Sequence, residues 1–451
     1  MFGRKLTDKK IKEIHDAVSQ ATDCDEALKL ASPLIKAQAS NEVAADALID
    51  LIRNENLTID KSLELLSEIY EAYKDNEDVV ILIGGALEAG KNLNYLNDAA
   101  PEHPLFRQII KHLSEMVLAC NDKEKEALIV EALSCATRLM ARQYDELAEK
   151  TYTRLVELLP DTAWVHYNQG LFYKTRGHFA EGVLANQRAM ELSEEPCDSY
   201  QWNLGICATG AGQGEIALNI WKEIGQNIEI GRFDLPDSRY PSCKVRLAQR
   251  PLAQRDADND DPGLEETIWV ERLSPCHGII RNVLFQDLGV DYGDVVLFDG
   301  APITYHKYGD QQIAVFPHLA TIRKRHYQFF DFAGTQADKG ELAYISEHLA
   351  KDAVIYSHTE NFSMLCSSCW RDETIDHEHR ESEEKHVVTG RIAIPPDVEP
   401  KDILDKIDSV LKDTPENRIF SPDLCRAAGL ESRARIEERR FNMLRATLNE
   451  G

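Results

Sequence analysis

The amino-acid sequence predicts a helical superhelix over residues 1–235 and a mixed α/β domain over residues 236–451. Three observations lead to this fold class. A helix-pair pattern recurs about every 35 residues between positions 129 and 225. The chain before it keeps apolar residues at helical spacing. After position 263, short runs rich in β-branched and aromatic residues alternate with helical stretches, as in α/β proteins.

The first elements are helices without repeat markers. Apolar residues recur every three or four positions in segments 46–52, 62–70 and 106–118, which predicts amphipathic helices. Terminal units of a repeat array are often atypical in sequence. We therefore expect the superhelix to begin before the detectable repeats.

The repeat carries small and aromatic residues in phase. The markers are Gly170, Tyr173, Gly177, Phe179 and Ala189, then Leu204, Gly205, Gly212, Ala217 and Trp221 one period later, and Leu139, Ala148, Tyr152 and Pro160 one period earlier. Gly170 and Gly205 are expected to let helices approach closely, and Gly177 and Gly212 suit left-handed turns. This pattern resembles the tetratricopeptide repeat family over about 100 residues. An ordinary helical bundle with chance spacing is the alternative.

The resemblance implies a concave groove, lined by the first helix of each pair, that binds a protein or peptide. The implied groove residues are Trp164, Tyr167, Leu171, Lys174, Ser199 and Trp202, with Ile206, Thr209, Val130, Leu133, Thr137 and Met140. Aromatic side chains supply the contact area that anchors an interface. Some family members grip a carboxylate with Lys, Asn and Arg; the basic members are missing here, although Asn168 and Asn203 are present. The same aromatics can instead pack inside the protein, and both interpretations stay open.

The C-terminal elements follow a segment, 247–263, that is typical of a linker or surface loop. Strands are predicted at 267–273, 294–298, 312–316, 327–333, 353–357 and 386–394, and helices at 339–349, 400–411 and 431–448. Two of these passages run from strand to helix. We expect them to form one domain with a mixed sheet.

A Cys/His cluster lies between the last two predicted strands. Cys366 and Cys369 are spaced so that two thiolates can reach one ion, and His377 and His379 follow within about ten residues. These four residues predict a closed, structural zinc site that would order a long polar loop. A redox Cys-x-x-Cys pair and a solvated loop are the alternatives. The redox reading is weaker, because the following residues do not promise the helix that would stabilise a thiolate.

Other cysteines and histidines show no catalytic spacing. Cys276 and His277 are adjacent, so on a strand they point to opposite faces, and a core cysteine is the preferred interpretation. His306, His318 and His358 lie at predicted strand or turn ends, where ordinary hydrogen-bonded histidines are expected. The sequence has no phosphate loop, dinucleotide fingerprint or serine elbow, so no catalytic residue is assigned.

Composition restricts partners and compartment. The chain has 77 acidic and 51 basic residues and a net charge of -26, which disfavours nucleic acid and favours a basic protein or peptide. It has no apolar run of the length that spans a membrane and no apolar signal region near its start, so no membrane association is expected. Ten scattered cysteines without framework spacing indicate reduced thiols and a cytoplasmic location.

These features together favour a cytosolic adaptor that binds a protein or peptide, with an α/β domain that holds structural zinc. One alternative is a metal-dependent hydrolase whose helical domain selects the substrate; an open zinc position would distinguish it. A second alternative, based on acidity alone, is an inhibitor of a basic protein.

Overall fold

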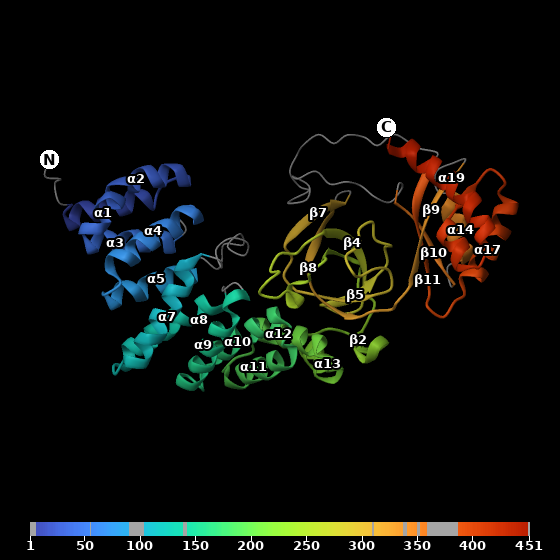
Figure 1. The fold of residues 1–451 in the computed structure, drawn as a ribbon. Coiled ribbons are helices and arrows are strands. Elements are labelled where there is room, and N and C mark those ends of the chain that lie inside the picture. The colour runs from blue at the N-terminus through green and yellow to red at the C-terminus, as the bar shows by residue number, and fades with distance from the viewer. Residues whose placement is uncertain are drawn as a thin grey trace. The chain divides into compact units, whose positions relative to one another are not determined.

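The computed structural model describes residues 6–54, 56–89, 103–138, 142–308, 311–336, 341–349, 352–358 and 387–449. The chain forms two compact units. The first comprises Met1–Lys174, Glu181–Asn203 and Asp256–Asp260, and the second comprises Thr175–Ala180, Leu204–Arg255 and Asp261–Gly451. Helices occupy the N-terminal part as far as residue 223, and strands dominate after it (Figure 1). The predicted fold class, helical first and mixed α and β afterwards, is confirmed.

Consecutive helices make up the N-terminal part. They are α1 (Asp8–Val18), α2 (Cys24–Ala37), α3 (Glu42–Arg53), α4 (Ile59–Tyr73), α5 (Glu77–Ala89), α7 (Pro104–Ala119), α8 (Lys123–Arg138), α9 (Asp145–Leu158), α10 (Ala163–Arg176), α11 (Phe179–Leu192), α12 (Asp198–Gly210) and α13 (Gly214–Glu223). One continuous apolar core runs from Ile11 in α1 to Phe172 in α10. This succession is compatible with a helical repeat, and it extends well before the detectable repeats, as expected.

The predicted roles of the repeat glycines are confirmed. Gly177 and Gly212 have φ values of 77° and 71°, in the left-handed region where a side chain is strained. A Cβ atom on Gly205 would lie 2.5 Å from the ring of Trp221, which is fully buried. Glycine is therefore required where α12 crosses α13, because any side chain there would overlap the tryptophan.

A polar crossing lies between α10, α11 and α12. Asn186 in α11 is fully buried, and a Cβ atom on Gly170 would lie 2.3 Å from its amide nitrogen. This amide donates to the backbone oxygen of Gly182 at 2.6 Å. The Asn186 Oδ1 atom accepts a hydrogen bond of 2.9 Å from Asn203. These hydrogen bonds offset the loss of hydration of the buried asparagine.

The second unit contains a closed five-stranded barrel. Its strands are β3 (Cys243–Ala248), β4 (Glu265–Arg272), β5 (His277–Ile280), β6 (Val295–Phe298) and β8 (Gln311–Arg323), and β7 (Thr304–Tyr308) pairs with β8 outside the ring. The pairs around the ring are antiparallel except β3 with β8, which are parallel and close it. Residues of alternating strand positions fill the interior. The predicted linker is the connection between the neighbouring strands β3 and β4, where Gln249 N–H donates to Leu264 O at 2.8 Å.

A separate antiparallel sheet follows the barrel. Its order is β10 (Val354–Ser357), β11 (Val387–Ile394), β9 (Gln328–Thr335) and β12 (Arg418–Phe420). The associated helices are α14 (Glu341–Leu349), α17 (Pro400–Asp413), α18 (Pro422–Ala427) and α19 (Glu431–Asn449) (Figure 1). The barrel is the expected mixed sheet, because its β3–β8 pair is parallel and its other pairs are antiparallel. The predicted strands do not all belong to it, since the chain leaves the barrel after β8, turns at residues 324–327 and starts a second sheet with β9.

Candidate functional site

The implied groove residues occupy two helices of the first unit. On α10, Trp164, Tyr167 and Leu171 are half-buried and Lys174 is buried. On α12, Ser199 is exposed and Trp202 is half-buried. Val165 and Phe172 form the buried face of α10 instead. Tyr167 and Leu171 thus keep part of their surface exposed, whereas Trp164 packs against the apolar core of the first unit.

An aromatic pair joins these two helices. The rings of Tyr167 on α10 and Tyr200 on α12 have centroids 4.7 Å apart and an interplanar angle of 35°. Burial raises the pKa of Tyr200, so its hydroxyl stays protonated at neutral pH. The sequence analysis missed Tyr200. Its position one residue after an implied groove residue, at the start of α12, is the signal that would have revealed it.

Several other implied groove residues belong to the core. Ile206, Thr209, Val130 and Leu133 are buried, so a partner does not reach them. Trp164 packs at its edge against the apolar core of the first unit. Asn203, the residue that suggested a carboxylate clamp, donates its amide to Asn186 instead, as described above. The Thr137 side chain and Met140 lie outside the described residues.

Three acidic residues precede or begin α12. Glu194 and Glu195 lie in the connection between α11 and α12, and Asp198 begins α12, in the same helix as Tyr200; all three are exposed. Within the described residues their carboxylates form no ion pair. By contrast, the nearby Glu191 pairs with Arg188 at 3.2 Å. We call these three residues the acidic rim; they carry negative charge at the start of the helix that bears Tyr200.

The predicted zinc ligands cannot be located. Cys366, Cys369, His377 and His379 lie outside the described residues, so the zinc site stays a prediction. Within the ranges that are described, no group of three or more His, Cys, Asp and Glu side chains could hold a metal ion.

Cys276 and His277 are buried at the start of β5. Both side chains are inaccessible to solvent, which confirms the core interpretation of Cys276. Burial raises the pKa of Cys276 to about 11, so its thiol is not an activated nucleophile at neutral pH. The Ser274 hydroxyl lies 2.5 Å from His277 Nδ1, and burial lowers the pKa of His277 to about 4. This histidine is therefore a neutral structural residue.

The three other histidines singled out in the sequence analysis are also hydrogen-bonded structural residues. His318 Nδ1 accepts a hydrogen bond of 3.4 Å from Ala248 N–H, across the strands that close the barrel. His306 Nδ1 lies 3.3 Å from the Lys244 ammonium. His358 follows β10, and its Nε2 lies 3.0 Å from the backbone oxygen of Val283. His358 thereby contacts the barrel loop described next.

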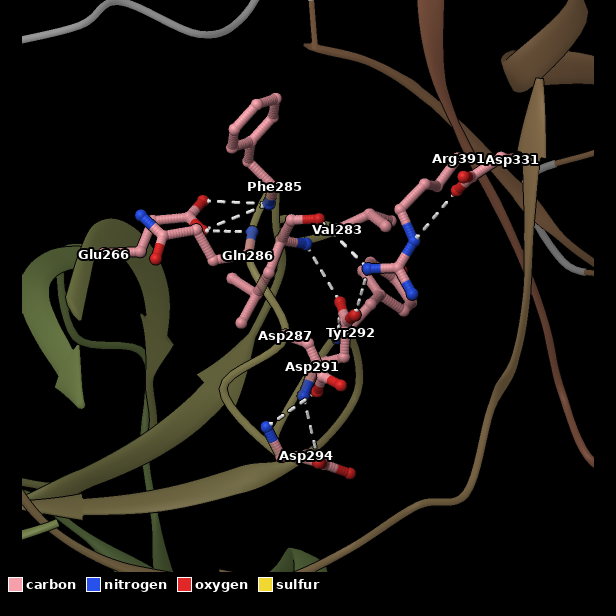
Figure 2. A network of polar contacts seen from close by, with 12 residues as sticks. Glu266, Val283, Phe285, Gln286, Asp287, Asp291, Tyr292, Asp294, Asp331 and Arg391 are labelled. Atoms are coloured by element: carbon pink, nitrogen blue, oxygen red, sulfur yellow. Dashed lines mark hydrogen bonds and ion pairs between the residues drawn. The ribbon is translucent and has the colours of Figure 1, made fainter. Parts of the chain in front are cut away.

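An arginine–aspartate pair joins the C-terminal sheet to the barrel. Arg391 on β11 reaches the loop between β5 and β6 (Figure 2), where its Nη1 donates to Asp291 Oδ2 at 2.6 Å and to Leu284 O at 3.0 Å. The other Asp291 oxygen accepts hydrogen bonds from the backbone of Leu284 and Tyr292, at 2.9 and 2.7 Å. Burial raises the pKa of Asp291, although Arg391 opposes this shift.

Two more carboxylates fix the same loop. Asp294 accepts hydrogen bonds from the backbone of Asp291 and Arg325, at 3.1 and 2.7 Å. Glu266 on β4 accepts from the N–H groups of Phe285 and Gln286 on the opposite side of the loop (Figure 2). Burial raises the pKa values of Asp294 and Glu266. The loop is therefore held by three partly buried carboxylates, and its conformation is set before any ligand arrives.

A cavity of about 480 Å³ lies against this loop. Its lining comes from the loop, from the turn between β8 and β9, and from β9 and β11. The basic run at positions 323–326, Arg-Lys-Arg-His, supplies two of the lining residues, Lys324 and His326. The sequence analysis missed these residues and Arg391. The basic run in an otherwise acidic chain is the signal that would have marked the turn.

The chain was compared with known proteins. No protein-family model matches it, and no curated protein matches its sequence. None of the helices in the described ranges is both long and apolar enough to cross a membrane. The function proposed below is therefore derived from the geometry of the sites themselves.

Proposed function

We propose that this protein is a tetratricopeptide-like scaffold that binds a basic peptide segment of a partner protein. The binding surface consists of Trp164, Tyr167, Leu171, Ser199, Tyr200 and Trp202, which we call the α10–α12 surface. The observation that carries the proposal is the tilted ring contact between Tyr167 and Tyr200, together with the acidic rim at the start of α12. Half-buried aromatic rings are the usual anchors of protein interfaces, because they bury a large area at a small cost in conformational entropy.

The charge of the surface selects the partner. Glu194, Glu195 and Asp198 are exposed at and just before the start of α12, and none forms an ion pair among the described residues. A peptide with Lys or Arg next to an aromatic or aliphatic side chain would match both features. Its cations would face the rim, and its apolar side chain would pack on the rings. Rim charges act mainly on association rate and specificity, so we expect binding to weaken as salt concentration rises.

The test begins with selection of binders from a random peptide library on the full chain, followed by fluorescence anisotropy of the enriched peptides. We expect these peptides to combine basic and apolar residues. The double variant Tyr167→Ala/Tyr200→Ala should weaken their binding by about 2 kcal/mol, roughly thirty-fold, as truncated interface anchors do. Circular dichroism should show that the helices remain.

Charge reversal provides a variant that leaves the packing intact. Glu195→Lys should weaken the binding of a basic peptide several-fold, because it places a like charge on the rim. Asp75→Lys is the matched control, since this exposed residue after α4 also forms no ion pair among the described residues. Enriched peptides without cations, or equal effects of the two reversals, would contradict the proposal.

A further inference from the structure

The cavity beside the β5–β6 loop has the size of a ligand site. Its volume of about 480 Å³ falls within the usual range for small molecules. Phe285, Tyr327 and Phe329 give it aromatic walls. Phe285 is 55% exposed, although its ring meets His358 edge-to-face at 5.6 Å. Phe285 therefore contributes aromatic surface to the wall of the cavity, whereas the guanidinium of Arg391 lies over the ring of Phe329, 4.5 Å from its centroid.

The acidic residues of the cavity are mostly occupied. Asp291 binds Arg391 and two backbone N–H groups, and Asp294 binds two more, as described above. Asp331 lies 3.7 Å from Arg391 Nε and 4.0 Å from an Arg445 nitrogen. The lining carboxylates thus serve mainly to hold the loop and the arginines in place.

The cations of the β8–β9 turn are in the opposite situation. Lys324 and His326 line the cavity and are exposed, and among the described residues neither side chain forms an ion pair or a hydrogen bond. Asp294 interacts electrostatically with both residues, but among the described residues no carboxylate is in ion-pair contact with either, which is unexpected in a chain with a net charge of -26. The turn is also strained, because His326 has a φ of 56°. A left-handed conformation in a non-glycine residue costs about 1 kcal/mol or more and is often retained where it serves a site.

We propose that this cavity binds a small anion that carries a planar apolar group. Lys324 and His326 hold the carboxylate or phosphate of this ligand. The planar group packs on the aromatic wall formed by Phe285, Tyr327 and Phe329. The fixed loop keeps the cavity open in the unliganded protein, so binding needs little reorganisation.

The test uses three ring compounds of similar size: benzoate, phenyl phosphate and neutral benzamide. Ligand-observed NMR with the full chain should detect benzoate or phenyl phosphate at millimolar concentration, the affinity expected for roughly ten heavy atoms. Benzamide should bind at least ten-fold more weakly. A preference for one anion over the other identifies the acidic group of the ligand, and either preference supports the proposal.

Variants of the same turn locate the binding site. Lys324→Gln should weaken anion binding at least ten-fold, and His326→Asn should weaken it while an asparagine tolerates the left-handed conformation. Arg323→Gln is the matched control. It removes an equal charge from the end of β8, next to the turn, but Arg323 lies over the Phe233 ring, 5.4 Å from its centroid, and does not line the cavity.

Three results would overturn the proposal. In the first, neither benzoate nor phenyl phosphate binds at 10 mM, roughly the weakest affinity expected for ligands of this size. In the second, benzamide binds as tightly as the two anions. In the third, Lys324→Gln and Arg323→Gln lose the same amount of anion affinity. The last result would indicate a general charge effect of the turn rather than a defined site.

Discussion

Acid should destabilise the barrel through its buried histidines. His318 is 3% exposed, and its Nδ1 accepts the N–H of Ala248 across the pair of strands that closes the barrel. A protonated Nδ1 cannot accept this bond. Burial lowers the pKa of His318 from 6.5 to about 4, and that of His277 likewise. Between pH 6.5 and about 4, these two histidines therefore bind more protons in the unfolded chain than in the folded barrel.

The sign and size of the effect follow from this difference. The stability that the neutral histidine contributes is fully present above pH 6.5 and is lost as the pH falls toward 4. Proton linkage for one such histidine gives a loss of about 1.4 kcal/mol at pH 5.5 and about 2.6 kcal/mol at pH 4.5. The carboxylates with raised pKa values, such as Asp291, act in the opposite direction, so the effect must be measured as a difference between variants.

Hydrogen exchange of the β3 segment that contains Ala248 measures the opening of the barrel separately from the helices. After correction for intrinsic exchange rates, we expect the opening free energy to fall between pH 7.5 and 4.5. In His318→Gln, which keeps an acceptor for Ala248 but does not titrate, this fall should be smaller by about 2 kcal/mol. His348→Gln, at an exposed position on α14, should behave like the wild type. An identical pH dependence in wild type and His318→Gln would refute the reasoning.

Three further outcomes can be checked. Gly205→Ala should lower the free energy of unfolding by about 2 kcal/mol in urea denaturation, since its Cβ would lie 2.5 Å from a buried tryptophan ring. Gly85→Ala is the matched control: its Cβ would have no described atom within 4 Å, and we expect it to raise the free energy of unfolding by about 0.5–1 kcal/mol. Asp291→Asn should cost about 2 kcal/mol in the same assay, because its arginine partner would be left with a weaker acceptor. Elemental analysis should find about one zinc ion per chain, and none in Cys366→Ser/Cys369→Ser; a metal-free wild type would contradict the predicted site.

The repeat was predictable because its determinants are local. Gly177 and Gly212 are needed for a backbone conformation that depends on one residue, and Gly205 is needed for one contact at a regular spacing. The exception is not local. The role of the buried Asn186 became clear only with its hydrogen bond to Asn203, 17 residues away. Side-chain pairs between helices are set by packing, which a marker pattern does not encode.

The separation into a barrel and a sheet was not predictable. The strands themselves have the expected composition, but their pairing depends on contacts between distant residues. The barrel closes where Val245 in β3 lies beside Phe316 in β8. The sequence of neither strand indicates that the other is its neighbour. A period-two pattern identifies a strand and its buried face, yet it leaves the neighbours of that strand open.

The junction shows which charges are informative in an acidic chain. Arg391 and Asp291 are 100 residues apart, and each looks like an ordinary surface charge in the sequence. Asp291 and Asp294 accept hydrogen bonds from backbone N–H groups and so fix the loop, as aspartates in turns commonly do. Acidic residues are so numerous in this chain that a cluster of them is weak evidence for a binding site. Lys324 and His326 are more informative, because among the described residues neither forms an ion pair although acids are so numerous. Within the same described ranges Glu194, Glu195 and Asp198 form no ion pair either, whereas their neighbour Glu191 pairs with Arg188. Both of our proposals therefore start from side chains without an ion pair in the described ranges, more than from the presence of charge.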